Sequence, residues 1–111
     1  MKRISRAPFE SELETIRKGL KQYGAQKAIL FGSYARGDYH AGSDVDLIII
    51  KETDLPFLER SAEVWRECRS SLTIEPLVYT PAEFARMRRE NNPFVEQALR
   101  EGVAIYEQER E

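Results

Sequence analysis

At 111 residues the chain is long enough for one small domain with a single hydrophobic core, and we predict one domain over residues 1–111. Hydrophobic residues make up 41% and charged residues 32%, a balance that excludes a disordered tail. The 17 basic and 19 acidic side chains nearly cancel, so the composition provides no overall attraction for nucleic acid or for an anionic membrane.

The single cysteine and the amino terminus indicate the cellular compartment of the protein. Cys68 alone excludes an internal disulfide or a cysteine-built zinc site, and it suits a reducing environment. Residues 1–9 are basic but lack the apolar stretch of a secretory signal, and no apolar run in the sequence is long enough to cross a bilayer. We therefore expect a cytoplasmic protein without a membrane partner or direct nucleic-acid binding.

The first predicted element is a helix over Ser11–Tyr23, because apolar residues recur there at helical spacing: Leu13, Ile16 and Leu20. Ser11 and Glu14 are placed as a capping box at its start, and Gly24 is a stop signal.

Two apolar runs then predict buried strands. Lys27–Phe31 is too short for a helix before Gly32 intervenes. Asp44–Ile50 is mostly branched and apolar, and its two acids interrupt only one face. These two strands form the core of the expected sheet.

The segment Pro56–Ser70 begins with a favourable early proline and predicts a second long helix, with one apolar face that packs: Leu58, Ala62 and Trp65. Ile74–Tyr79 follows as a strand. Since Pro76 cannot donate a hydrogen bond to a ladder, we expect this strand at an edge of the sheet or at a bulge.

Two further helices follow, each opened by a capping residue and a proline. Thr80-Pro81-Ala82-Glu83 starts a helix to Arg89, and Asn92-Pro93 starts another that ends at Gly102. The apolar face of the latter consists of Phe94, Val95, Ala98 and Leu99. Residues 103–106 can form a last short strand. Together the elements predict an α/β (α+β) fold, a small mixed sheet flanked by helices.

A glycine–serine pair and two aspartates carry the chemistry. Gly32-Ser33 directly follows the first predicted strand, and Asp44 and Asp46 open the second. Residues i and i+2 of a strand point the same way, so both carboxylates project from one face and repel each other. A hard divalent cation relieves that repulsion, and ligation by oxygen alone fits magnesium better than zinc.

The residues after Gly32 suit a phosphate. Ser33–Arg36 can form a short helix that Gly37 ends, which leaves free backbone N–H groups near Gly32 and Ser33. Arg36 could contact a phosphate or a partner, although an exposed helix arginine is an equally good interpretation. A backbone cradle with metal-held carboxylates supplies the positioning and charge neutralisation that phosphoryl and nucleotidyl transfer require.

The combination of Gly32-Ser33, ten intervening residues and Asp44-x-Asp46 resembles the signature of the polymerase-beta-type nucleotidyltransferases, and Gly-Ser-Tyr-Ala-Arg-Gly looks like their small prokaryotic members, the minimal nucleotidyltransferases. The resemblance implies the polymerase-beta-like nucleotidyltransferase fold, with Mg²⁺ bound by Asp44, Asp46 and a third acid on a neighbouring strand that also helps to activate the attacking hydroxyl. The matching position is Glu75, where family members usually carry aspartate.

The resemblance also implies a reaction and a partner. Small members are often paired with a helical HEPN-domain toxin and act as its antitoxin by transferring AMP from ATP to it. We therefore expect ATP or another nucleoside triphosphate as substrate and a protein hydroxyl as acceptor, and we leave self-association open.

Two other hypotheses stay open. The glutamate and the adjacent Pro76 at the third acid position favour a catalytically weak, antitoxin-like subunit that neutralises a partner by binding alone. An unrelated α/β domain that carries the motif by coincidence would show no metal-dependent nucleotide binding.

Overall fold

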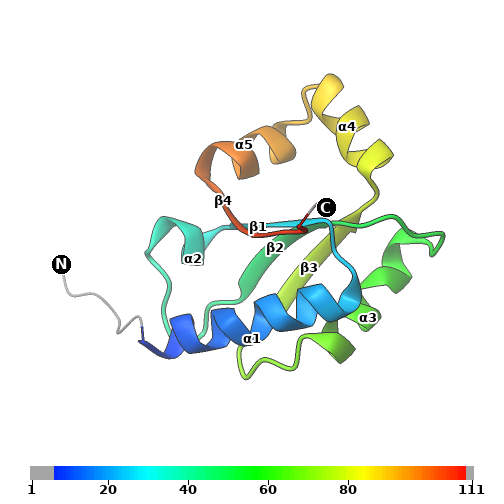
Figure 1. The fold of residues 1–111 in the computed structure, drawn as a ribbon. Helices are drawn as coiled ribbons and strands as arrows, with labels where there is room; N and C mark the ends of the chain where they lie inside the picture. The colour runs from blue at the N-terminus through cyan, green and yellow to red at the C-terminus, as the bar shows by residue number, and fades with distance from the viewer. Residues whose placement is uncertain (1–6, 110–111) are drawn as a thin grey trace.

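The computed structural model describes residues 7–109 of the chain (Figure 1). Its helices are α1 (Ala7–Tyr23), α2 (Ser33–Arg36), the 3₁₀ turn η1 (Phe57–Glu59), α3 (Arg60–Glu67), α4 (Pro81–Arg89) and α5 (Pro93–Glu101). Its strands are β1 (Lys27–Phe31), β2 (Val45–Ile50), β3 (Ile74–Tyr79) and β4 (Val103–Glu107). No helix in the described part is long and apolar enough to span a membrane.

The strands form one mixed sheet in the order β3-β2-β1-β4. β1 pairs antiparallel with β2 and β4, whereas β2 and β3 are parallel and connected through η1 and α3. Figure 1 shows α1 and α3 on one face of the sheet and α4 and α5 on the other. This layered arrangement confirms the predicted fold class.

Alternation along β2 divides the core between the two faces. Val45, Leu47 and Ile49 belong to the cluster under α1 and α3, while Ile48 and Ile50 pack with Ala98 of α5. A strand covered by helices on both faces is expected to be an almost continuous apolar run, which is what β2 is after its first residues. Asp46 shares its face with Ile48 and Ile50, because side chains two residues apart point the same way.

The edge strand β3 explains how Pro76 is accommodated. Outward carbonyl groups of β3 accept hydrogen bonds from side chains of α3: Trp65 Nε1 to Ile74 at 2.8 Å, Ser61 Oγ to Pro76 at 3.4 Å and Arg60 Nη1 to Val78 at 2.9 Å. The N–H that Pro76 lacks would point to the same free side, so no ladder bond is lost. The predicted edge position is confirmed.

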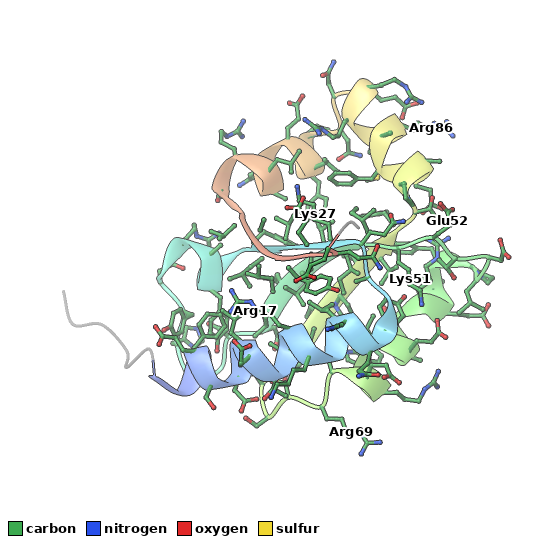
Figure 2. The ribbon with its side chains drawn as sticks, in the orientation of Figure 1. Arg17, Lys27, Lys51, Glu52, Arg69 and Arg86 are labelled. Carbon is green, nitrogen blue, oxygen red and sulfur yellow. The ribbon has the colours of Figure 1, made fainter. Side chains whose placement is uncertain are left out.

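The other edge strand, β4, has a bulge opposite Ala28 and Ile29. One of its carbonyls, that of Ile105, accepts a hydrogen bond of 2.7 Å from Nε of Arg17, which α1 projects toward it (Figure 2). A bulge and a bound carbonyl both make an edge less suitable for pairing with another strand.

The start of α1 differs from the prediction. The helix begins at Ala7, so Ser11 lies inside it, and its carbonyl accepts from Thr15 Oγ1 at 3.4 Å. The predicted capping box of Ser11 and Glu14 is therefore wrong. The added turn has a packing reason, because the ring of Phe9 stacks on Tyr34 with centroids 4.7 Å apart.

The predicted helix 56–70 is divided into η1 and α3, and its predicted buried face was wrong. Leu58, Ala62 and Trp65 are exposed, with relative exposures of 88% for Leu58 and 52% for Trp65. The buried side chains are Arg60, Val64 and Cys68.

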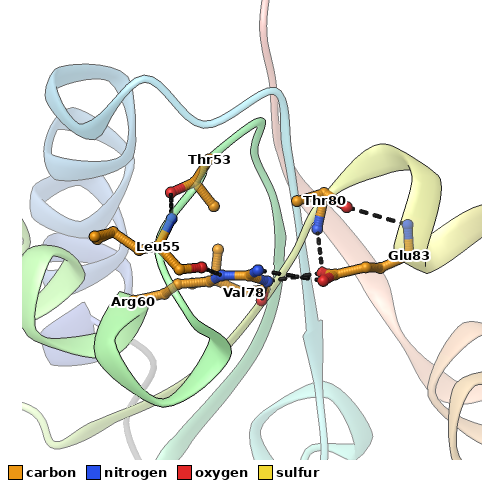
Figure 3. A network of polar contacts seen from close by, with 6 residues as sticks. All are labelled: Thr53, Leu55, Arg60, Val78, Thr80 and Glu83. Atoms are coloured by element: carbon orange, nitrogen blue, oxygen red, sulfur yellow. Dashed lines mark hydrogen bonds and ion pairs between the residues drawn. The ribbon is translucent and has the colours of Figure 1, made fainter.

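Arg60 can be buried because its guanidinium is paired and hydrogen-bonded (Figure 3). Its Nε donates to the Leu55 carbonyl at 2.8 Å, and Nη1 and Nη2 contact the Glu83 carboxylate at 2.7 and 3.2 Å. Glu83 also closes the predicted capping box with Thr80 at the start of α4, which the structure confirms. This network joins α3, the end of β3 and α4.

Candidate active site

The centre of the candidate site is the contact between Gly32 and Asp46. The register of β1 and β2 places Phe31 opposite Asp46, so Gly32 lies next to the carboxylate. A Cβ on Gly32 would overlap Oδ2 of Asp46 and lie 3.2 Å from its Cγ. Gly32 also has φ of 73° and ψ of −154°, a conformation that only glycine adopts readily. Backbone geometry and the close approach each require glycine.

The one-turn helix α2 presents its first backbone N–H groups at the same place. Hydrogen bonding within this turn starts with the N–H of Ala35 and of Arg36, both to the Gly32 carbonyl. The N–H groups of Ser33 and Tyr34 come before Ala35 in the turn and are not used in these bonds. As donors at the start of a helix, they can donate hydrogen bonds to an anion. Gly37 ends the turn with φ of 87°, as predicted.

An aromatic stack fixes α2 against α1. Tyr34 is buried, and its ring centroid lies 4.2 Å from that of Tyr39. The ring of Phe9 contacts both, with its centroid 4.7 Å from that of Tyr34 and 5.8 Å from that of Tyr39. The stack therefore holds Gly32 and Ser33 between a packed strand and a packed turn. Such preorganisation reduces the entropy lost when a ligand binds.

The three predicted acids lie at one end of the sheet. Asp46 and Glu75 are direct partners in the register of the parallel pair β2 and β3, while Asp44 precedes β2, which begins at Val45 and not at the predicted Asp44. Partial burial raises the pKa of the Asp46 carboxyl, and repulsion from Asp44 and Glu75 adds to the effect while Arg36 opposes it. The three carboxylates thus share one electrostatic environment.

Within residues 7–109 no three acidic, histidine or cysteine side chains are close enough together to hold a metal ion as they stand. Asp46 and Glu75 are brought side by side, and Asp44 is held in the preceding loop. Asp44 and Glu75 are exposed, so their side chains can change rotamer at little cost. The donor set, three carboxylates whose mutual repulsion a cation would relieve, fits magnesium in its chemistry.

Arg36 forms ion pairs with two acidic side chains. Its Nε lies 3.3 Å from Oδ2 of Asp38, and its Nη1 lies 3.6 Å from Oε1 of Glu101 in α5. Hydrogen bonding to Asp38 is the main cause of the raised pKa of Arg36. Glu101 was not predicted from the sequence, because a contact between α2 and the end of α5 depends on the tertiary fold.

A pocket of about 200 Å³ lies beside Gly32. Its walls come from the end of β1 and from α2 and α5, and include Phe31, Gly32, Arg36, Phe94, Ala98 and Glu101. The rings of Phe31 and Phe94 meet edge to face with centroids 5.4 Å apart. Phe94 was predicted as part of the packing face of α5, but it is 40% exposed and lines this pocket.

A larger hollow of about 440 Å³ lies elsewhere, at the start of β1, between Lys27 and Arg88. It contains none of the predicted site residues, and the end of β1 that carries Gly32 lies away from it. The chemical groups therefore favour the smaller pocket as the candidate site, since a site is identified by its convergent polar groups and not by its size.

Comparisons with known proteins identify the family of the chain. A family model described as polymerase beta, nucleotidyltransferase matches residues 14–111. A protein of Methanocaldococcus jannaschii described as a putative protein adenylyltransferase is 36% identical over 77 residues, which cover 64% of this chain and 72% of that protein.

Solved structures share the fold. A crystal structure described as a putative nucleotidyltransferase from Sulfolobus solfataricus matches with a TM-score of 0.62 at 20% identity, over 96% of this chain and 93% of that one. A toxin–antitoxin structure determined with AMP-PNP matches with a TM-score of 0.59 at 20% identity, over 87% of this chain and 74% of that one. With the family model spanning nearly the whole sequence, the chain belongs to the polymerase-beta-type nucleotidyltransferase family.

Proposed function

We propose that this protein is a magnesium-dependent adenylyltransferase that transfers AMP from ATP to a hydroxyl group of a partner protein. The observation that carries the proposal is the contact of Gly32 with Asp46, with Glu75 next to Asp46 in the register. It combines a phosphate-binding turn with a group of carboxylates. The M. jannaschii relative, described as a putative protein adenylyltransferase, supports a protein acceptor.

Each residue has a defined task in this proposal. The N–H groups of Ser33 and Tyr34 donate hydrogen bonds to the triphosphate, and the absent side chain of Gly32 allows the phosphates to approach. Asp44, Asp46 and Glu75 would hold Mg²⁺, which neutralises phosphate charge when bound. Glu75, exposed beside Asp46, accepts the proton of the acceptor hydroxyl. The hydroxyl oxygen then bonds to the α-phosphorus of ATP as the bond to the β-phosphate breaks, and pyrophosphate leaves.

Arg36 would change partners when the nucleotide binds. Its ion pair with Asp38 is exposed on both sides and therefore weak, and its pair with the half-buried Glu101 is long at 3.6 Å, so a phosphate oxygen can compete for the guanidinium. In this proposal the two acids keep Arg36 extended over the pocket until the triphosphate arrives.

The proposed partner is a helical HEPN-type toxin, and the protein would act as its antitoxin. The fold shared with an antitoxin-containing complex solved with an ATP analogue supports this assignment. We also infer a cytoplasmic location, where ATP is abundant and where a free thiol such as that of the buried Cys68 remains reduced.

The test is to express the chain with a helical HEPN-type protein, taken from the neighbouring reading frame if that frame encodes one, and to weigh the partner by mass spectrometry. The proposal expects one or more added adenylyl groups, absent with the double variant Asp44→Asn, Asp46→Asn. Asp54→Asn, at an exposed position in the loop after β2, should retain the modification. If the partner stays unmodified, and the wild-type chain and the double variant neutralise it equally, the protein acts by binding alone.

A further inference from the structure

The outward side of η1 and α3 carries an apolar stripe. Leu58, Ala62 and Trp65 follow one another at helical spacing, and all are exposed, Leu58 by 88% and Trp65 by 52%. The opposite side of α3 packs into the core through Val64 and Cys68. Large apolar side chains at helical spacing on the solvent side of a helix are typical of a surface that binds another helix.

Trp65 is suited to be the anchor of such a contact. Its Nε1 donates to the Ile74 carbonyl at 2.8 Å, so the indole is held against the edge of β3 while about half of it stays exposed. A side chain that is already fixed loses little rotamer entropy when a partner covers it, and tryptophan is enriched among residues that dominate binding energies.

Charged residues flank the stripe with opposite signs at its two ends. Glu59 lies beside Leu58, and Arg66 lies beside Trp65, seven residues or about two helical turns later, so both are on one flank. Both side chains are exposed, and within residues 7–109 neither forms an ion pair. Arg69, one turn further on, extends away from the sheet (Figure 2).

We propose that a second copy of this chain binds here, with the two α3 helices antiparallel about a two-fold axis near Ala62. A two-fold axis reverses the helix direction but keeps each flank on its side. Leu58 then faces Trp65 of the partner subunit, and Glu59 faces Arg66 of the partner subunit. Both the apolar and the charged pairs are formed twice, so the surface is complementary to itself.

Pairing of sheet edges does not account for the stripe. The outward carbonyls of β3 are already bound by side chains of α3, so that edge offers little to another strand. The stripe is also separate from the acids, because Asp46 faces α5 on the other side of the sheet. One short helix from each copy buries a small area, so we expect a reversible dimer and not an obligate one.

Charge exchange tests the proposal directly. Sedimentation equilibrium of the full chain at concentrations up to about 1 mM, where weak complexes still form, should show a reversible dimer. Glu59→Arg alone and Arg66→Glu alone should each weaken association at least about tenfold, because each places like charges opposite one another. The double variant Glu59→Arg, Arg66→Glu restores opposite charges and should restore the dimer.

Two further variants serve as controls. Arg89→Glu makes the same charge change on α4, away from the stripe, and should leave association unchanged, whereas Leu58→Asp should abolish it. Both positions are exposed, so circular dichroism should show folded proteins. A wild-type chain that is monomeric throughout, or a double variant that stays as monomeric as the single ones, would overturn the proposal and leave the stripe to a different protein.

Discussion

Replacing Arg60 by methionine should destabilise the protein strongly, although Arg60 lies outside the candidate active site. The residue is only 5% exposed, and its guanidinium contacts Glu83 and the carbonyls of Leu55 and Val78. Methionine keeps much of the apolar stem but removes every donor. The two carbonyls and the carboxylate that lose their partner come from three different segments (Figure 3).

The expected cost follows from the degree of burial of each partner. An acceptor left unsatisfied in the interior costs about 1–3 kcal/mol. The Val78 residue is buried, whereas Glu83 keeps 44% of its side chain exposed and can be rehydrated, so its share is small. We therefore expect Arg60→Met to lower the free energy of unfolding by about 3 kcal/mol.

Urea denaturation followed by circular dichroism measures this effect, and Arg86→Met is the matched control. Arg86 also pairs with a glutamate, at 3.0 Å from Glu90, but both side chains are mostly exposed and the pair should be worth less than about 0.5 kcal/mol. A loss for Arg60→Met no larger than for Arg86→Met would refute the reasoning that burial makes the network important.

Three other substitutions test separate features. Gly32→Ala should abolish nucleotide binding and lower the free energy of unfolding by about 1–3 kcal/mol, since it adds strain at positive φ and an overlap with Asp46; calorimetry and urea denaturation measure the two losses. The hydrogen bond from Arg60, and after it that from the Thr80 N–H, lowers the pKa of Glu83. The Glu83 carboxylate therefore stabilises the fold above its unfolded pKa near 4.5, and this stabilisation is lost as pH falls through the lower folded pKa. Acid titration should show a shallower loss of folding stability for Glu83→Gln. Burial raises the pKa of Tyr23 to about 12, and its hydroxyl has no hydrogen-bond partner among residues 7–109. Tyr23→Phe should therefore stabilise the protein by up to about 1 kcal/mol at neutral pH and remove a loss of stability between about pH 10 and 12, as thermal melts across that range would show.

The parts of the fold that sequence reasoning predicted are those that depend on local chemistry. The capping box of Thr80 and Glu83 and the position of Pro76 at an edge follow from backbone hydrogen bonding within a few residues. Gly32 was predicted for phosphate access, and the structure adds a second reason, the carboxylate of Asp46 against its Cα.

The errors occur where tertiary contacts decide. The period of apolar residues favoured Leu58 and Trp65 as a buried face, but Arg60 is buried in their place because Glu83, more than twenty residues later, pairs with it. Likewise Ser11 and Glu14 have the spacing of a capping box, yet Phe9 packs on Tyr34 and extends the helix beyond them. Local spacing contains no information about either long-range partner.

The residues of the candidate site were predicted better than their arrangement in space. The motif identified Asp44 and Asp46, and the resemblance pointed to Glu75, which the structure places next to Asp46 across β2 and β3. The wall formed by Phe94 and Glu101 was missed, because only the return of α5 over the sheet brings it to Gly32.

The most direct test of the central claim is calorimetric titration of the purified chain with ATP, in the presence of Mg²⁺ and after its removal by a chelator. We expect magnesium-dependent binding that is lost in the folded double variant Asp44→Asn, Asp46→Asn and kept in the matched variant Asp54→Asn. Binding of equal strength without Mg²⁺, or binding that survives the double substitution, would contradict the assignment of these carboxylates to a metal–triphosphate site.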